Sequence, residues 1–135
     1  MPITSISLAD AQRYTEWLSQ KTGGVYRLPT DVEWSYAANA NGGAADRSSV
    51  NCVVEVNGQK LRGLNLEAVK SGATNAWGLY NSVGNAQEWV RSGTSVSVRG
   101  GAFSDNVSQC TPTASHPHPG SPDPLTGFRV LRELK

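Results

Sequence analysis

The segment that decides the fold reads Trp77-Gly-Leu-Tyr-Asn-Ser-Val-Gly-Asn-Ala-Gln-Glu-Trp89. Two shorter blocks follow it, Arg99-Gly-Gly-Ala-Phe103 and Thr126-Gly-Phe-Arg129. A fourth block lies upstream and reads Tyr26-Arg-Leu-Pro-Thr-Asp-Val-Glu-Trp-Ser-Tyr-Ala-Ala38. Four blocks in a fixed order are far more specific than any one of them alone.

Together the four blocks resemble the signature of the formylglycine-generating, sulfatase-modifying family, from about Pro2 to Leu134. The family's domain is an elaborated C-type-lectin fold. The resemblance therefore implies an α+β, C-type-lectin-like fold of the formylglycine-generating sulfatase-modifying type, with two helices plus short antiparallel strands and much irregular loop. We expect residues 1–135 to form a single domain, the C-terminal module of a larger protein, because the chain starts at a segment that is internal in the family.

Composition excludes several kinds of partner. The chain has 135 residues, which fits one domain. Its formal net charge is +1 and its isoelectric point about 7.8, so neither nucleic acid nor a membrane surface is an expected partner. No apolar run approaches the roughly 20 residues of a spanning helix. Without a signal peptide in this sequence, the expected location is the cytoplasm.

Capping signals predict the two helices. Ser7 followed by Asp10 is typical of a helix N-terminus, and apolar residues recur at helical spacing as far as Lys21. Thr30 and Glu33 form a second capping box. The tryptophans Trp17, Trp34, Trp77 and Trp89 match family core positions, so we predict that all four are buried.

Short strands separated by glycine or asparagine are predicted for the rest. Asn57-Gly58 favours a hairpin with a type I′ turn between residues 52 and 61. Further strands are expected around 86–90, 96–99 and 127–132. Five of the seven prolines lie between Ser104 and Leu125, too many for a central strand or a helix there.

Cysteine decides between an enzyme and a binding module. By the resemblance, family members that oxidise a substrate cysteine carry two thiols five residues apart, and here those positions hold Asp105 and Cys110. A carboxylate neither binds the soft copper(I) ion that thiolates select nor exchanges disulfides, so we predict no enzyme of this type. Cys52 and Cys110 form either a structural disulfide or two buried free thiols, and both interpretations stay open.

The resemblance also implies a cofactor. Gly84, Ala86 and Glu88 match the family segment that holds a structural calcium ion through backbone carbonyls and the glutamate side chain. The alternative is that Glu88 pairs with Arg99 or Arg129 and the glycine only makes a turn. No other cofactor is expected.

The segment between Phe103 and Leu125 departs most from the family. From Ser104 to Asp123 it contains no lysine or arginine, and small polar residues and proline dominate. A polar loop of free composition inside a rigid frame favours a recognition surface at about residues 104–118 for a protein or other macromolecular ligand. The expected contacts are Ser104, Asp105, Asn106, Val107, Thr113, Ser115, His116 and His118.

This segment resembles the variable proteins of diversity-generating retroelements, which carry the same lectin-like domain. In them, adenine-directed substitution just before a terminal Gly-Phe-Arg yields residues such as Asn, Asp, Ser, Thr, His and Pro. Most of the segment is drawn from that set, whereas Gln109 is not and would belong to the fixed scaffold. Loops are also commonly polar and proline-rich whatever their history.

Three functional hypotheses follow. The first is a non-catalytic ligand-recognition module, and the second is the use of that module as the sensor or docking domain of a larger protein such as a kinase. The alternative is a metal-dependent oxidase or oxygenase of the family, with Cys110, His116 and His118 as the available metal ligands. The two histidines alone lack the further ligands of a zinc site and are typical of an exposed loop.

Overall fold

The first helix, α1 (Leu8–Thr22), is set by its caps. The computed structural model describes residues 2–43, 50–71 and 73–134. The Ser7 hydroxyl accepts a hydrogen bond of 3.0 Å from the Asp10 N–H, and Gly23 ends the helix in the left-handed conformation. The prediction of this helix is confirmed. Its inner face is narrow, since only Ala11 and Thr15 are fully buried.

The second helix, α2 (Asp31–Asn39), begins at the predicted capping box. Thr30 accepts from the Glu33 N–H, and the Glu33 carboxylate accepts from the Thr30 N–H at 2.8 Å. The helix buries Trp34 and Ala38 and is followed by a 3₁₀ turn, η1 (Ala40–Gly42).

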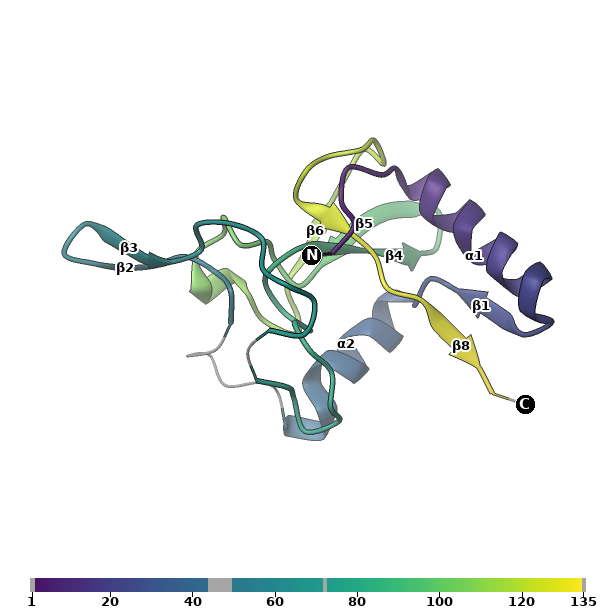
Figure 1. Cartoon of the computed structure of the whole chain (residues 1–135), viewed down its shortest axis with the longest axis horizontal. Coiled ribbons are helices and arrows are strands. Elements are labelled where there is room, and N and C mark those ends of the chain that lie inside the picture. The colour runs from purple at the N-terminus through teal and green to yellow at the C-terminus, as the bar shows by residue number, and fades with distance from the viewer. Residues whose placement is uncertain (1, 44–49, 72, 135) are drawn as a thin grey trace.

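A four-stranded sheet in the order β6-β5-β4-β7 carries the rest of the domain (Figure 1). Its strands are β4 (Gln87–Ser92), β5 (Ser95–Arg99), β6 (Ser115–Pro117) and β7 (Thr126–Gly127). The β4–β5 and β5–β6 pairs are antiparallel, whereas β4 and β7 are parallel. The prolines keep β6 at the edge of the sheet, as the sequence predicted, and a short 3₁₀ helix, η3 (Val107–Gln109), precedes it.

Two further pairs of strands flank the sheet. The strands β1 (Val25–Arg27) and β8 (Leu131–Glu133) pair across almost the whole sequence. The strands β2 (Val54–Val56) and β3 (Gln59–Arg62) form the predicted hairpin, which projects from the body of the molecule (Figure 1). Both turn residues, Asn57 and Gly58, have positive φ, as a type I′ turn requires.

One predicted strand is divided. The expected strand at residues 127–132 is two strands, β7 and β8, which belong to different sheets and are separated by residues 128–130. The chain changes partner there, from β4 to β1, so one continuous ladder is not formed.

The core consists of two clusters on either side of β4. One contains Trp34, Val90 and both cysteines, and the other contains Leu28, Trp89 and Val98. The prediction that all four tryptophans are buried is wrong for two of them. Trp17 is 54% exposed and Trp77 is 45% exposed, because neither enters a cluster. Trp17 lies tilted against the exposed Tyr14, and Trp77 packs edgewise on the exposed Tyr36. Within the described part of the chain, no helix combines the length and apolarity needed to span a bilayer.

Gly84 tests the packing around the disulfide. A β-carbon at Gly84, where φ is +74°, would lie 2.7 Å from the Cys52 sulfur and 3.0 Å from the Asn51 carbonyl oxygen. At Gly78, φ is +81° but nothing lies within 4 Å. We expect Gly84→Ala to lower the free energy of unfolding by about 3 kcal/mol and Gly78→Ala by about 1 kcal/mol, since only the first adds overpacking to backbone strain. Urea denaturation measures both, and equal losses would contradict this packing.

Candidate recognition surface and the residues beneath it

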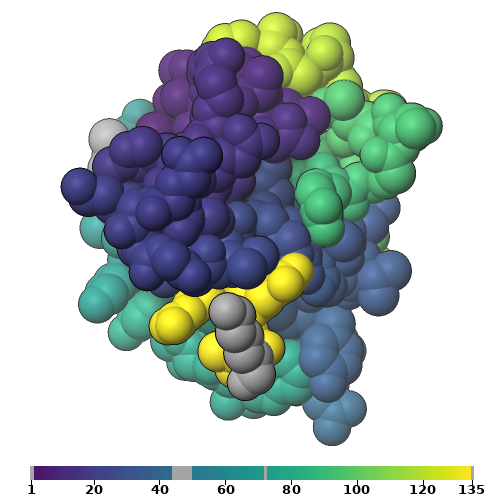
Figure 2. All heavy atoms as spheres, turned by 90° about the vertical axis from the view of Figure 1, so that its right-hand side faces the viewer, coloured from purple at the N-terminus to yellow at the C-terminus, as the bar shows by residue number. Residues whose placement is uncertain are grey.

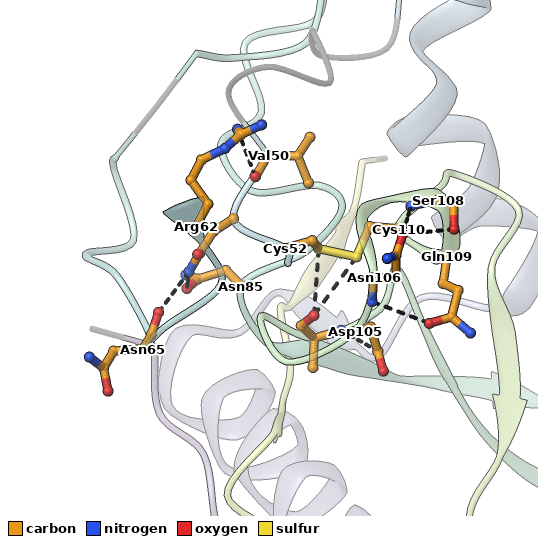
Figure 3. Close-up of a disulfide and its surroundings, with 12 residues drawn as sticks. Val50, Cys52, Arg62, Asn65, Asn85, Asp105, Asn106, Ser108, Gln109 and Cys110 are labelled. Atoms are coloured by element: carbon orange, nitrogen blue, oxygen red, sulfur yellow. Dashed lines mark hydrogen bonds between the residues drawn. A yellow bond between two sulfur atoms is a disulfide. The ribbon is translucent and has the colours of Figure 1, made fainter. Parts of the chain in front are cut away.

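Both cysteines are joined in one buried disulfide. The Cα atoms of Cys52 and Cys110 are 6.7 Å apart, and the residues are 0% and 2% exposed (Figure 3). Of the two interpretations left open by the sequence, the disulfide is therefore the one found in the structure. The bond ties the middle of the candidate segment to the base of the β2–β3 hairpin.

Asp105, which stands at the family's first thiol position, is part of the frame. Its Oδ2 accepts a hydrogen bond of 2.8 Å from the Ala102 N–H, and its own N–H donates to the Ala102 carbonyl at 3.0 Å. The Asp105 carbonyl accepts from the Val53 N–H at 2.8 Å. Each of these contacts is internal, so Asp105 fixes a turn.

The next residues complete a short ladder with the hairpin base. The Val107 N–H donates to the Val53 carbonyl at 3.0 Å, and the Val107 side chain packs against the core. Asn106 is exposed, accepts from the Ser108 N–H and donates its own N–H to the Gln109 side chain (Figure 3). The Gln109 side chain thus caps the start of the 3₁₀ helix, and its place in the fixed scaffold stays a prediction.

The exposed members of the predicted contact set are polar. We call Ser104, Asn106, Thr113, Ser115 and His116 the polar set, since each of these five residues is exposed. Three of them lie on or beside the edge strand β6, where Val98 pairs with His116. Beneath them the Arg99 guanidinium donates to the Thr113 carbonyl at 3.1 Å and pairs with Asp31.

His118 points inward instead of into solvent. Its Nδ1 accepts from the Gly120 N–H at 3.0 Å, so Nε2 carries the proton that faces the Asp123 carboxylate at 2.5 Å. The imidazole packs edgewise on Trp89, with ring centroids 4.5 Å apart, and its side chain is only 12% exposed. The expectation of an exposed histidine loop is thus correct for His116 but not for His118, which anchors the segment.

The buried Glu88 carboxylate forms an ion pair with the partly exposed Arg129. Its carboxylate accepts from the Arg129 Nε at 2.7 Å, from the Arg129 Nη2 at 2.9 Å and from the Trp34 indole at 3.1 Å. The charge of Glu88 outweighs desolvation and raises the pKa of Arg129. This is the arginine pairing that the sequence analysis weighed against calcium.

The surroundings of Glu88 do not fit a calcium ion at Gly84, Ala86 and Glu88. A guanidinium already neutralises the carboxylate that the ion would need. Among the residues that the structure describes, no group of three or more His, Cys, Asp or Glu side chains could hold a metal ion. Calcium at this turn stays a prediction.

Buried asparagines are structural residues that the sequence analysis missed. Asn75 donates to the Ala37 carbonyl at 2.9 Å and accepts from the Trp77 and Leu79 N–H groups. Asn85 similarly accepts from Asn51, and both are at most 3% exposed. The sequence signal for Asn75 and Asn85 is their place beside and within the Trp77–Trp89 block, where a polar residue that is buried must find hydrogen-bond partners.

The fold and this frame define a class of protein, a C-type-lectin-like α+β domain with short strands around two helices. The chain belongs to the family of the sulfatase-modifying factor enzyme 1-like domain, whose model matches residues 1–134. That family includes enzymes.

Solved structures share the fold. The chain is similar to PvdO from Pseudomonas aeruginosa, with a TM-score of 0.84, 23% identity, and coverage of 99% of this chain and 62% of that chain. For CarF the TM-score is 0.82 at 24% identity, covering 99% and 68%. Variable protein 1 of Treponema denticola has a TM-score of 0.62 at 23% identity, covering 79% and 47%.

Curated relatives are longer proteins. The serine/threonine-protein kinase pkn1 of Chlamydia pneumoniae is 32% identical over 90 residues, which cover 67% of this chain and 13% of the kinase. The formylglycine-generating enzyme of Streptomyces coelicolor is 32% identical over 105 residues, covering 65% and 31%. The chain therefore spans less than a third of the length of either relative.

The disulfide should contribute much of the stability. The bond closes a loop of 58 residues, for which the chain-entropy model gives about 4 kcal/mol. We expect the double variant Cys52→Ala, Cys110→Ala to lose about that much free energy of unfolding in urea denaturation. Dithiothreitol should destabilise the parent and leave the double variant unchanged. A parent that is insensitive to reduction would rule out this contribution.

Asp123 should make stability depend on acid. Burial alone would raise its pKa, but hydrogen bonds from Thr126, His118 and Leu125 outweigh burial and hold the pKa below its ordinary value of 3.8. The unfolded chain then takes up the proton at higher pH than the folded chain, so this stabilisation is present above pH 3.8 and disappears as pH falls through the lowered value. Asp123→Asn should lower the Tm at pH 7, and the difference from the parent should shrink on acidification. A constant difference between pH 7 and pH 2 would contradict the assignment.

Proposed function

We propose that this domain is a non-catalytic recognition module that binds a protein or other macromolecular ligand through the polar set. The observation that carries the proposal is the disulfide between Cys52 and Cys110. Because Cys110 is bonded to Cys52, no free thiol is left at the one family oxidase position that holds a cysteine in this chain. What remains at the surface of that segment is a group of small polar side chains on a fixed frame.

The comparison with the oxidases supports a module without redox chemistry. Oxidation of a substrate cysteine by this family's route needs a thiol pair, and here the first position is a carboxylate bonded to the Ala102 N–H. The second position is Cys110, which is disulfide-bonded and only 2% exposed. The Asp105 carboxylate has no sulfur and cannot form a mixed disulfide. An incoming thiol could bond the Cys110 sulfur only by reaching this buried site and displacing Cys52 as a thiolate.

The division between frame and surface supports recognition. Asp105, Val107, Cys110 and His118 point inward and hold the segment by bonds to the hairpin base, the core and Asp123. The five residues of the polar set are exposed, while their backbone is held by contacts such as the bond from the Arg99 guanidinium to the Thr113 carbonyl. A surface held in shape before binding loses little conformational entropy when the ligand arrives.

The relatives support two settings for the module. Likeness to the Treponema variable protein supports diversification of the polar set, and likeness to part of a kinase supports use as a sensor domain attached to further domains. Both belong to the proposal, since the chain covers only part of each relative.

Sequencing this gene across many cells of one population tests diversification position by position. We expect substitutions at the five positions of the polar set and none at the inward positions Asp105, Val107, Cys110 and His118. The matched pair His116 and His118 is the internal control, because the two differ in exposure and not in type. Equal variation at both histidines, or none at either, would contradict the proposal that the polar set is diversified.

The catalytic alternative has its own assay. The purified domain, loaded with copper(I) and incubated with a cysteine-containing peptide and oxygen, should leave the cysteine unchanged by mass spectrometry. The Streptomyces enzyme serves as the positive control. Conversion of the cysteine by this domain would overturn the proposal.

A further inference from the structure

Two turns of the backbone cover the disulfide. Cys52 is 0% exposed and Cys110 is 2% exposed. A β-carbon at Gly84 would lie 2.7 Å from the Cys52 sulfur, and a β-carbon at Gly101 would lie 2.8 Å from the Cys110 sulfur. The Ala102 carbonyl oxygen lies 3.5 Å from the first sulfur and 3.8 Å from the second. At neither glycine is there room for even one added carbon atom.

The two turns close together. The Gly84 N–H donates a hydrogen bond of 2.9 Å to the Gly100 carbonyl, so the turn over Cys52 is bonded to the turn over Cys110. The Asn85 N–H donates to the Asn51 carbonyl at 2.9 Å, which fixes the first turn beside Cys52. We call residues 84–85 and 100–102 the cover of the disulfide.

Disulfide exchange needs the space that the cover fills. An outside thiolate or disulfide reacts with a cysteine through a mixed disulfide, in which a third sulfur is bonded to that cysteine. The third sulfur must lie next to Cys52 or Cys110, where the backbone of Gly84 and Gly101 already lies. The bond can therefore be made or broken by exchange only while the cover is open.

A separate ladder aligns the two cysteines. The Val53 N–H donates to the Asp105 carbonyl at 2.8 Å, and the Val107 N–H donates to the Val53 carbonyl at 3.0 Å. These bonds join the residue next to Cys52 to the segment that leads to Cys110. None of them involves the cover, so the two thiols can meet before the cover closes.

We propose that the mature domain is the product of a dithiol oxidation by an outside disulfide, which occurs before the cover closes and outside the reducing cytosol. The thiolate of one cysteine attacks the outside disulfide, and one outside thiolate leaves. The thiolate of the other cysteine then displaces the second outside thiolate from the mixed disulfide. The chain loses two electrons and two protons, and the outside disulfide is reduced to two thiols.

The compartment follows from the chemistry of the pair. The chain has two cysteines, and both are in the bond. Thiol systems of the cytosol keep cysteines reduced, whereas disulfides form and persist in oxidising compartments. The proposal therefore differs from the cytoplasmic location expected from the sequence. It does not depend on ligand recognition, because its readout is the state of two thiols.

Reduction of the native domain tests the cover. The bond should be reduced roughly 100-fold more slowly in dithiothreitol alone than in dithiothreitol with guanidinium chloride, because exchange waits for the cover to open. Free thiols are labelled with a maleimide and counted by mass spectrometry. Equal rates would show that the sulfurs are accessible in the fold and would overturn the proposed order of steps.

The variants Gly84→Ala and Gly78→Ala are a matched pair for the same assay. The first places a carbon against the Cys52 sulfur, whereas nothing lies within 4 Å of the second. Gly84→Ala should therefore speed reduction without denaturant about 10-fold relative to Gly78→Ala. Equal reduction rates in the two variants would contradict the cover. If Gly84→Ala fails to fold, the parent with and without guanidinium chloride still decides.

Production of the chain in two compartments of one bacterium tests the location. The chain is either kept in the cytosol or exported to the periplasm behind a cleavable signal. An affinity tag follows β8, which lies at the surface (Figure 2) and far from the β2–β3 hairpin (Figure 1). After acid quenching and labelling in denaturant, the exported chain should carry no maleimide and the cytosolic chain should carry it on both cysteines. A labelled exported chain, or an unlabelled cytosolic chain, would overturn the proposal.

Discussion

The ion pair between Glu88 and Arg129 is the interaction on which the arrangement of this domain depends. Glu88 lies on β4 in the middle of the sheet, and its carboxylate also accepts from Trp34 on α2. Arg129 reaches it from the C-terminal segment and also donates to the Tyr80 and Asn81 carbonyls. The Glu88–Arg129 pair therefore joins the sheet, α2, the loop at residues 80–81 and the segment between β7 and β8. Removing Arg129 would leave the Glu88 carboxylate, whose side chain is only 8% exposed, without its counter-charge. Such a loss costs about 3–5 kcal/mol at fully buried pairs and less here, because the Arg129 side chain is 36% exposed.

The ion pair also explains how the segment between β7 and β8 is fixed by a side chain and not by a strand ladder. The Arg129 side chain bridges from the segment between β7 and β8 to the loop at residues 80–81. The side chain fixes the segment, while residues 128–130 belong to neither of the flanking ladders. Arg129 also lines both pockets beside this segment, of about 370 and 170 Å³, and its guanidinium occupies the position that a cation would need beside Glu88. The Glu88–Arg129 pair therefore affects the core at Trp34, the turn that precedes Glu88 and the two pockets lined by Arg129.

Much of the fold was predictable because its signals are local. The caps at Ser7 and Thr30 and the turn at Asn57 each act within a few residues, and the structure confirms all three. Tryptophan burial was not predictable in the same way. Trp17 and Trp77 match family positions, but whether such a side chain is covered depends on distant segments.

The candidate surface was predictable in extent and not in orientation. The lack of lysine and arginine marked the segment, yet polar type alone could not tell His116 from His118. The difference arises from Trp89 and Asp123, whose positions depend on tertiary contacts. Pairing of Cys52 with Cys110 likewise depends on the hairpin base and could not be chosen from two sequence positions. Long-range contacts decided each point that local chemistry left open.

The pairing of β1 with β8 has a consequence for synthesis of the protein. Val25–Arg27 meets its only ladder partner among the described residues at Leu131–Glu133, and the Arg27 side chain bonds Glu133 across 106 positions. While the ribosome exit tunnel still covers residues 131–133, that ladder cannot form. The segment Val25–Arg27 must therefore wait, with an open strand edge, until residues 131–133 have left the tunnel. Nascent chains in this state are the ones that chaperones protect from aggregation.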